Sequence, residues 1–174
     1  MRFPPFLLQG EEKEMDVSCC FIKEQYFIDH SNFQKMLDPG DTEKQSKRTY
    51  LCVKITSDSN DYYLPLRNNL GADVRLFGRI GHSIPSSMRP HAGLDYRYAL
   101  IVNDESYIEI PTTQKIPNIQ LQKIVGDYEN IVAEFSLYLK GFNKAAKKTR
   151  IDREPLYRES SLINFVQEMH VEVQ

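Results

Sequence analysis

The amino-acid sequence predicts an α+β fold in which helices accompany an antiparallel sheet or a small barrel. Strand patterns come mostly first and pair through short turns, as in hairpins, and a long helical pattern follows near the end. Helices do not alternate with strands, which argues against a doubly wound parallel sheet. With 174 residues, 41% of them hydrophobic, the chain can build one domain with a single core.

The N-terminal segment differs from the rest of the chain because acidic residues gather between positions 11 and 16. We expect residues 1–14 to be a flexible extension of a single domain at 15–174, with Met15 as an alternative start. The run FPPFLL is too short and too rich in proline for a signal peptide, and no run is long enough to span a membrane. We therefore expect a soluble cytoplasmic protein.

The first elements are a strand and a helix. Residues 17–22 form a short apolar run typical of a strand. Apolar side chains from Tyr26 to Leu37 then recur at helical spacing, and the sequence Asp-Pro-Gly at 38–40 ends that helix. Residues 41–48 are expected to form a polar loop.

A hairpin follows. Residues 49–55 alternate, so that Leu51 and Val53 share one face, and a turn cluster leads to a return strand at 62–66. Pro65 lacks an N–H, which places it at a strand end or a sheet edge.

The middle of the chain is less regular. Residues 75–80 have the composition of a strand, and residues 81–93 are typical of an irregular loop of the functional kind. Two further strands, at 96–102 and 106–110, predict a second hairpin.

A long amphipathic helix begins after Pro117, with Gly126 as its weak point, and its C-terminal end is basic. Ser160 or Ser161 caps a short final helix. The apolar stripe of the long helix consists of Leu121, Ile124, Val125, Tyr128, Ile131, Val132, Phe135, Tyr138 and Leu139.

Three cysteines and four histidines give no metal-ligand spacing, and the chain has no glycine-rich nucleotide motif. We therefore predict no cofactor and no metal. Reduced, buried thiols are the expected state of Cys19, Cys20 and Cys52. The net charge of -2 means that a nucleic-acid binder of this composition must gather its basic residues locally.

Basic and amide side chains gather where two predicted strands meet. Arg48 directly precedes the first strand of the hairpin, and Arg67, Asn68 and Asn69 directly follow the second. The hairpin places Arg48 beside Arg67, and two adjacent guanidinium groups suit a phosphate. The alternative is that each arginine is solvated or pairs with a nearby Asp or Glu.

Two histidines in the following loop, His82 and His91, are candidates for proton transfer in RNA cleavage, although a solvated loop histidine is the simpler alternative. Asp95 and Arg97 sit at a strand start, where a local turn built on Gly93 and Asp95 is the alternative. The basic end of the long helix suits phosphate contacts, or is simply a solvated face. The predicted RNA contacts are Lys44, Lys47, Asn69, Arg75, Arg97, Lys144, Lys147 and Lys148.

A series of short motifs occurs in a familiar order. They are RTYL at 48–51, YLPLRNN at 63–69, GLDYRYALIV at 93–102, YIEIP at 107–111, YLKGF at 138–142 and LYRESSLINF at 156–165. Over residues 15–170 this order resembles the TenpN-type toxins of type III toxin–antitoxin systems, relatives of the ToxN and AbiQ ribonucleases.

The resemblance implies a strongly bent antiparallel sheet with surrounding helices, similar to the MazF-like barrel. It implies a metal-independent endoribonuclease that leaves a 2′,3′-cyclic phosphate. It also implies a tandem-repeat antitoxin RNA as partner in a closed protein–RNA assembly, cellular or phage RNA as substrate, and phage defence by abortive infection.

Residue by residue, the resemblance carries the phosphate-contacting pair to Arg67 and Asn68, and a basic residue before a strand to Arg48. Asn68 stands where the family has serine, so it can donate a hydrogen bond but lacks a hydroxyl. The family's downstream histidine or basic residue is also missing, and the next candidates are Arg75, His82 and His91. A non-catalytic RNA-binding module is therefore the alternative, and a Tyr-rich protein-binding surface is a third.

Overall fold

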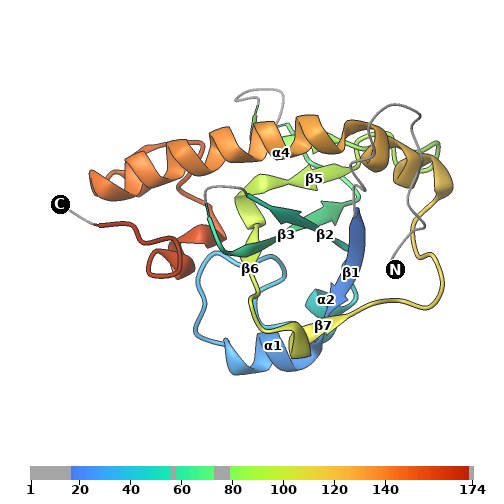
Figure 1. Cartoon of the computed structure of the whole chain (residues 1–174), viewed down its shortest axis with the longest axis horizontal. Helices are drawn as coiled ribbons and strands as arrows, with labels where there is room; N and C mark the ends of the chain where they lie inside the picture. Colours follow the sequence, from blue (N-terminus) through green and yellow to red (C-terminus); the bar gives the residue numbers. More distant parts are fainter. Residues whose placement is uncertain (1–16, 56–57, 73–78, 173–174) are drawn as a thin grey trace.

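A seven-stranded antiparallel sheet forms the centre of the molecule in a computed structural model, and one long helix, α4, lies over it (Figure 1). The structure describes residues 17–55, 58–72 and 79–172. The strands are β1 (Ser18–Ile22), β2 (Tyr50–Lys54), β3 (Asp61–Arg67), β4 (Gly81–Ser83), β5 (Gly93–Asp95), β6 (Leu100–Ile101) and β7 (Ile108–Glu109). The helices are α1 (Glu24–Asp29), α2 (Thr42–Ser46) and α4 (Asn118–Lys147), with 3₁₀ turns η1 (Tyr96–Tyr98), η2 (Glu105–Tyr107), η3 (Ile151–Arg153) and η4 (Ser161–Phe165).

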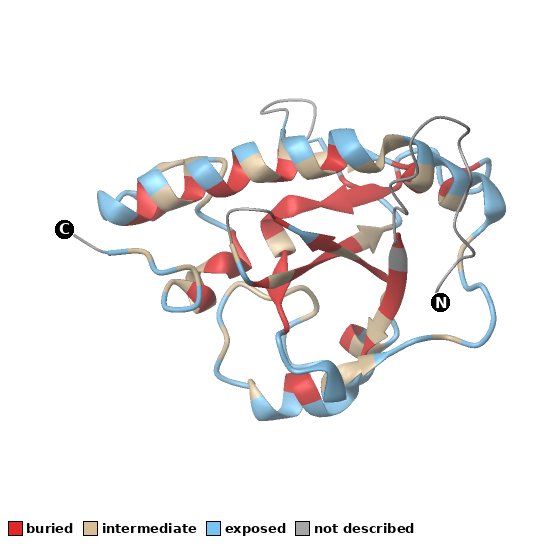
Figure 2. Ribbon diagram, viewed as in Figure 1, coloured by how far each residue is buried: buried red, intermediate tan, exposed pale blue. Residues whose placement is uncertain are grey.

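The strand order is β4-β5-β3-β2-β1-β7, with β6 added against β3, and every pair is antiparallel. The predicted antiparallel sheet with surrounding helices is confirmed. Among the described residues the sheet stays open, so of the two predicted forms it is the sheet and not the closed barrel that is found. Buried residues line the sheet and the side of α4 that faces it (Figure 2).

The predicted β2–β3 hairpin is confirmed, and in its register Tyr50 faces Pro65 and Val53 faces Tyr62. Leu51 and Val53 are buried, as their alternation predicted. Pro65, however, lies inside a central strand and not at an edge. Leu66 donates its N–H to Thr49 on the β2 side, so the nitrogen of Pro65 faces the opposite side.

On that opposite side β3 changes partner. Its residues Tyr62 and Tyr63 pair with β6, whereas Leu66 and Arg67 pair with β5. Pro65 falls between the two sets, where no ladder hydrogen bond is required, and this position explains how a central strand accommodates a proline.

The predicted helix over Tyr26 to Leu37 is too long, because α1 ends at Asp29. Lys35 and Asp38 have φ values of 55° and 49°, which are left-handed and not helical. The apolar spacing reflects packing of aromatic side chains on a series of turns. The predicted polar loop at 41–48 instead contains α2, which begins where Asp41 accepts the N–H of Lys44 at 2.9 Å.

The predicted second hairpin is wrong. β6 pairs with β3 and β7 pairs with β1, so the two segments do not pair with each other. The carboxylate of Asp95 accepts the N–H of Arg97 and begins η1, which replaces the first part of the predicted strand. Asp104 caps η2 in the same way and turns the chain towards β1.

Residues 81–93 are more regular than the predicted loop. β4 and β5 form a hairpin around residues 84–92, closed by the N–H of Ile84 on the carbonyl of Ala92 at 2.8 Å. The predicted strand at 75–80 lies mainly outside the described residues, as does Arg75.

The long helix is confirmed, with Ile124, Ile131 and Phe135 of the predicted stripe buried. It runs through Gly126 without a break. In place of the predicted short final helix the structure has the 3₁₀ turn η4, which Ser160 caps as expected, since its Oγ accepts the N–H of Leu162 at 3.3 Å. In the described part of the chain, no helix combines the length and apolar character needed to cross a bilayer.

All three cysteines are reduced thiols, as predicted. Cys19 and Cys20 are buried and Cys52 is half-buried. Burial raises the pKa of Cys19 and of Cys20 to about 12, so both stay protonated and unreactive at neutral pH.

Gly93 allows β5 to lie close to its neighbours, and its φ is not positive. A Cβ there would lie 2.3 Å from the carbonyl oxygen of His82 and 2.4 Å from Cδ1 of Leu70. We expect Gly93→Ala to lower the free energy of unfolding by about 3 kcal/mol, the upper range for overpacking, as measured by urea denaturation.

The matched control is Gly126→Ala, which makes the same chemical change on α4, where a Cβ meets nothing within 4 Å. It should stabilise the protein by up to about 1 kcal/mol, because alanine favours helix more than glycine does. Similar unfolding midpoints for the two variants would contradict the close packing at Gly93.

Candidate functional site

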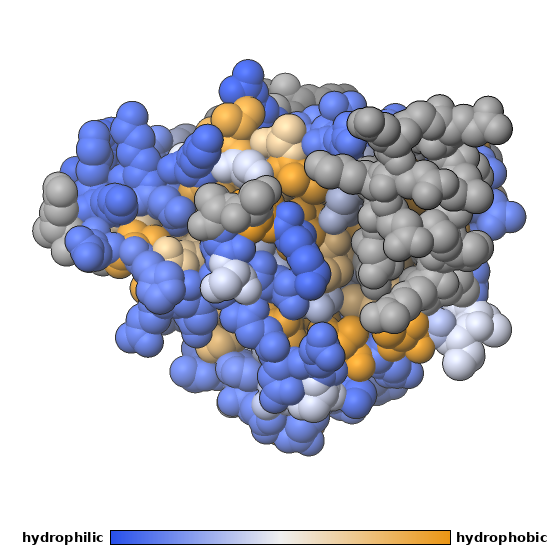
Figure 3. Space-filling model, in the orientation of Figure 1, coloured by the Kyte–Doolittle hydropathy of each residue, from blue (hydrophilic) through white to orange (hydrophobic). Residues whose placement is uncertain are grey.

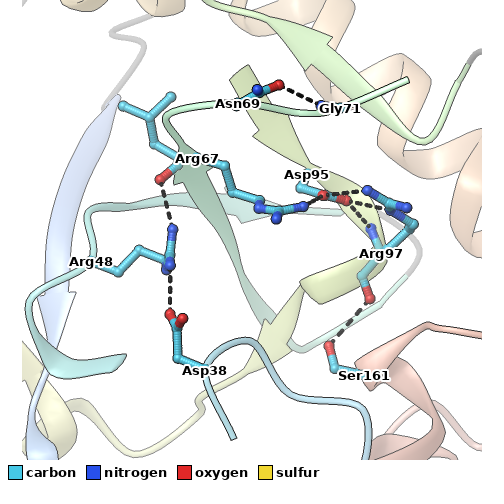
Figure 4. Close-up of polar contacts among 9 residues, drawn as sticks. Asp38, Arg48, Arg67, Asn69, Gly71, Asp95, Arg97 and Ser161 are labelled. Atoms are coloured by element: carbon cyan, nitrogen blue, oxygen red, sulfur yellow. Dashed lines mark hydrogen bonds and ion pairs between the residues drawn. The ribbon is translucent and has the colours of Figure 1, made fainter. Parts of the chain in front are cut away.

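Two arginines meet at one end of the β2–β3 hairpin (Figure 4). Arg48 precedes β2 and Arg67 ends β3, and Arg48 Nη1 lies 3.5 Å from the carbonyl oxygen of Leu66. The hairpin therefore places the two residues at the same end of the sheet, as predicted, and each guanidinium points to its own carboxylate.

Arg48 pairs with a carboxylate from the turn before α2. Its Nη2 lies 2.6 Å from Asp38 Oδ2, and Lys44 Nζ lies 2.6 Å from Asp38 Oδ1. Burial alone would raise the pKa of Asp38, but the hydrogen bonds from Lys44 and Arg48 outweigh it and hold that pKa below its ordinary value. Asp38 is therefore ionised and faces two cations.

Arg67 pairs with a second carboxylate, Asp95. Arg67 Nη1 lies 2.8 Å from Asp95 Oδ2, and Arg97 approaches the same carboxylate with Nη2 at 2.8 Å and Nε at 3.0 Å. The Asp95 side chain is fully buried and that of Arg97 is 7% exposed. A buried carboxylate of this kind persists because guanidinium groups compensate it.

The ring of Tyr98 lies beside both guanidinium groups of this second cluster. The Cζ atoms of Arg67 and Arg97 each lie 5.5 Å from its centroid, within range of cation–π attraction. Burial raises the pKa of Tyr98, against the opposing effect of Arg97, so its hydroxyl stays protonated. Tyr98 and Asp95 together fix the plane of the Arg67 guanidinium.

Arg67 is the more exposed of the two arginines that contact Asp95, with 28% of its side chain accessible against 7% for Arg97. Guanidinium carries five N–H donors, and within the described residues Arg67 uses one of them, on Asp95. The alternative in which each arginine pairs with a nearby carboxylate is thus the arrangement found. Because each carboxylate faces two cations, the site keeps an excess of positive charge that suits a phosphate.

Exposed amides and a histidine extend the site beyond β3. Asn68 and Asn69 are exposed, and Asn69 Oδ1 accepts the N–H of Gly71 at 2.8 Å. The N–H of Leu70 donates to the carbonyl of His91 at 2.9 Å, which places the exposed His91 beside this segment.

His82 is not brought to this site. The register aligns Leu66, Leu94 and His82 across three strands, and residues opposite each other share a face. Arg67 follows Leu66, so its side chain points to the other face. The His82 ring lies instead against α4, with Nδ1 2.9 Å from Glu134 Oε2 and Nε2 2.8 Å from Asp127 Oδ2.

The remaining predicted RNA contacts do not gather in one place. Arg97 is buried against Asp95, whereas Lys47 is exposed and pairs with Glu43 at 2.5 Å. Lys144, Lys147 and Lys148 line a depression of about 400 Å³ with Lys140 and Asn143. The surface around the C-terminal end of α4 is mainly hydrophilic (Figure 3).

Sequence reasoning missed the roles of Asp38 and Tyr98. The sequence marks Asp38 only as part of the helix stop at 38–40, and it places Tyr98 inside the predicted strand at 96–102. The sequence signal for Asp95 was its spacing of two residues from Arg97, which suits a capped turn. Within the described ranges, no three His, Cys, Asp or Glu side chains converge so as to hold a metal ion.

No protein-family model matches the chain, and no curated protein matches it in sequence. In structure the chain is similar to AbiQ, a lactococcal anti-phage endoribonuclease belonging to the type III toxin–antitoxin system, with a TM-score of 0.59. The alignment covers 88% of this chain and 97% of AbiQ at 15% sequence identity. At that identity, the likeness shows that the two chains share a fold.

Proposed function

We propose that this protein is an endoribonuclease toxin of a type III toxin–antitoxin system. The observation that carries the proposal is the arginine site at the end of the β2–β3 hairpin, on a fold shared with AbiQ over 88% of the chain. Arg67, Asn68, Asn69 and His91 gather there as exposed or half-exposed donors.

The reaction uses the RNA's own 2′-hydroxyl as nucleophile. Its oxygen attacks the adjacent phosphorus, the bond from phosphorus to the 5′-oxygen breaks, and the products are a 2′,3′-cyclic phosphate and a 5′-hydroxyl. This reaction needs proton transfer and stabilisation of charge on the phosphorane, and it proceeds without a metal ion.

Arg67 is the residue assigned to stabilise that charge, because Asp95 and Tyr98 hold its guanidinium while its other donors remain available. Asn68 supplies a second hydrogen-bond donor, which is neutral. Arg48 adds positive charge at the same end of the sheet. His91 is the residue assigned to proton transfer, because it is exposed and adjacent to Asn69 and Leu70.

The partner in this proposal is a tandem-repeat antitoxin RNA held in a closed protein–RNA assembly in the cytoplasm. The substrate is cellular or phage RNA, and the outcome is defence by abortive infection. Lys144, Lys147 and Lys148 provide a second basic surface for the RNA backbone.

The proposal is tested by inducing the wild-type protein in bacteria, following growth and mapping new RNA ends. Growth arrest with new 2′,3′-cyclic phosphate ends is the expected result. RNA binding with steep salt dependence but no new ends would favour the alternative, a non-catalytic RNA-binding module.

His91→Ala should slow RNA cleavage by about 10²–10⁴-fold, because it removes the proton-transfer group. The measurement is single-turnover cleavage of a radiolabelled RNA. The matched control is His170→Asn, which removes an exposed histidine elsewhere and keeps a side chain that tolerates the φ of 53° at that position. Equal rates for His91→Ala and wild type would remove His91 from the mechanism.

A further inference from the structure

A second polar cluster joins the long helix to the β4–β5 hairpin, on the other face of the sheet from Arg67. It contains three α4 side chains spaced seven residues apart, Gln120, Asp127 and Glu134. Seven residues make about two helical turns, so the three lie on one stripe of α4.

This stripe contacts two adjacent parts of the hairpin. The two ring nitrogens of His82 lie 2.9 Å from Glu134 Oε2 and 2.8 Å from Asp127 Oδ2. Gln120, which is 1% exposed, donates its Nε2–H to the carbonyl of Ile84 at 2.8 Å. The helix therefore holds the strand and the start of the loop that follows it.

The other partners of Asp127 and Glu134 determine whether the ring nitrogens of His82 must donate or accept hydrogen bonds. Tyr96 donates its hydroxyl to Glu134 Oε2 at 2.6 Å, and Lys123 lies 2.6 Å from Asp127 Oδ2. Hydrogen bonds from Lys123 and then His82 hold the pKa of Asp127 below its ordinary value. Burial is the main cause that raises the pKa of Tyr96, and the hydrogen bond to Glu134 adds to it. The hydroxyl therefore keeps its proton and donates a hydrogen bond to Glu134.

Both carboxylates are therefore acceptors, and the ring must donate at both nitrogens to satisfy them. Only the protonated imidazolium does so, because the neutral ring has one donor and one acceptor. A neutral ring would turn a lone pair towards one of the two carboxylates.

The hairpin held in this way carries His91. The N–H of Ile84 closes the loop on Ala92, and the carbonyl of His91 accepts the N–H of Leu70. Movement of β4 away from α4 would thus displace the loop that places His91 next to Asn69.

We propose that protonated His82 is a positioning residue that clamps the β4–β5 hairpin to α4 and so holds His91 at the cleavage site. The clamp stands on its own contacts, and its catalytic consequence rests on the proposed function.

The clamp is tested by amide hydrogen exchange, corrected for intrinsic rates. In His82→Ala, the amides of Ile84 and Leu70 should lose protection relative to the wild type, whereas those of the β2–β3 hairpin should not.

Asp127→Asn should keep more of this protection than His82→Ala does, because its amide can donate to a neutral ring while the other ring nitrogen donates to Glu134. The matched control is Glu129→Gln, which makes the same carboxylate-to-amide change at an exposed position of α4 and should behave as the wild type.

The catalytic consequence is tested by cleavage kinetics. His82→Ala should lower kcat by about 10²-fold, the effect of a small misplacement of a catalytic group, with KM little changed. Wild-type exchange at Ile84 and Leu70 in His82→Ala would overturn the clamp, and an unchanged kcat would overturn the positioning role. A wild type that cleaves no RNA would overturn the proposed function and, with it, the positioning role, while the exchange measurement still decides the clamp.

Discussion

Arg67→Ala should abolish growth arrest and lower RNA cleavage by about 10²–10³-fold, the effect of removing one preorganised donor to a developing oxyanion. The side chain is half-exposed at the end of β3, and its remaining N–H groups are free to reach a phosphate. Growth of induced cultures and the yield of cyclic-phosphate ends measure the two effects.

The loss should not come from unfolding. Asp95, the buried partner of Arg67, keeps three hydrogen bonds with Arg97, two from the guanidinium and one from the backbone N–H. The far-ultraviolet circular dichroism and the urea midpoint of Arg67→Ala should therefore stay close to those of the wild type.

Arg67→Lys is the informative companion variant. It keeps the charge but replaces the planar fork by a single ammonium group, which cannot hold Asp95 and a phosphate in the same geometry. We expect it to recover only a small part of the activity. Full activity in Arg67→Lys would show that only charge matters, and full activity in Arg67→Ala would remove Arg67 from the site.

Asp95→Ala should have the largest effect on stability, a loss of about 3–5 kcal/mol in the free energy of unfolding. The substitution leaves the guanidinium of Arg97 buried without its carboxylate, and it also removes the cap of η1. Urea denaturation followed by fluorescence or circular dichroism measures the change.

Two further variants separate charge burial from simple truncation. Asp61→Ala removes a carboxylate whose partner, Lys54, is 77% exposed, and it should cost at most about 1 kcal/mol. Replacing both Asp95 and Arg97, by leucine and methionine, should cost less than Asp95→Ala alone, because no buried charge is left unpaired. A double variant as unstable as Asp95→Ala would contradict this explanation.

The sequence was sufficient to predict the β2–β3 hairpin, because alternation and turn residues are local signals. The hairpin is also what predicted Arg48 beside Arg67, since the start of its first strand lies next to the end of its second. The pairing of β6 with β3 and of β7 with β1 was not predictable in this way, since those strands are two residues long and their partners lie far along the chain.

The candidate site was predictable to the same extent. The arginines belong to the hairpin, whereas Asp38 reaches Arg48 from a turn with a left-handed residue that no periodic pattern marks. The β4–β5 register determines the face of the sheet on which His82 lies. A segment that the sequence predicts as a loop has no strand register, so this face could not be predicted. Proximity in sequence to Arg67 therefore could not distinguish His82 from His91.

The open sheet described above has a consequence for self-association. Unpaired backbone groups at the edge of a sheet can recruit another chain, and long flat edges are where aggregation begins. Here the strands at the two ends of the sheet are β4, which has three residues, and β7, which has two. One of the two residues of β7 is the exposed Glu109. Edges this short give an incoming strand almost nothing to pair with, so the sheet can remain open without becoming a template for aggregation.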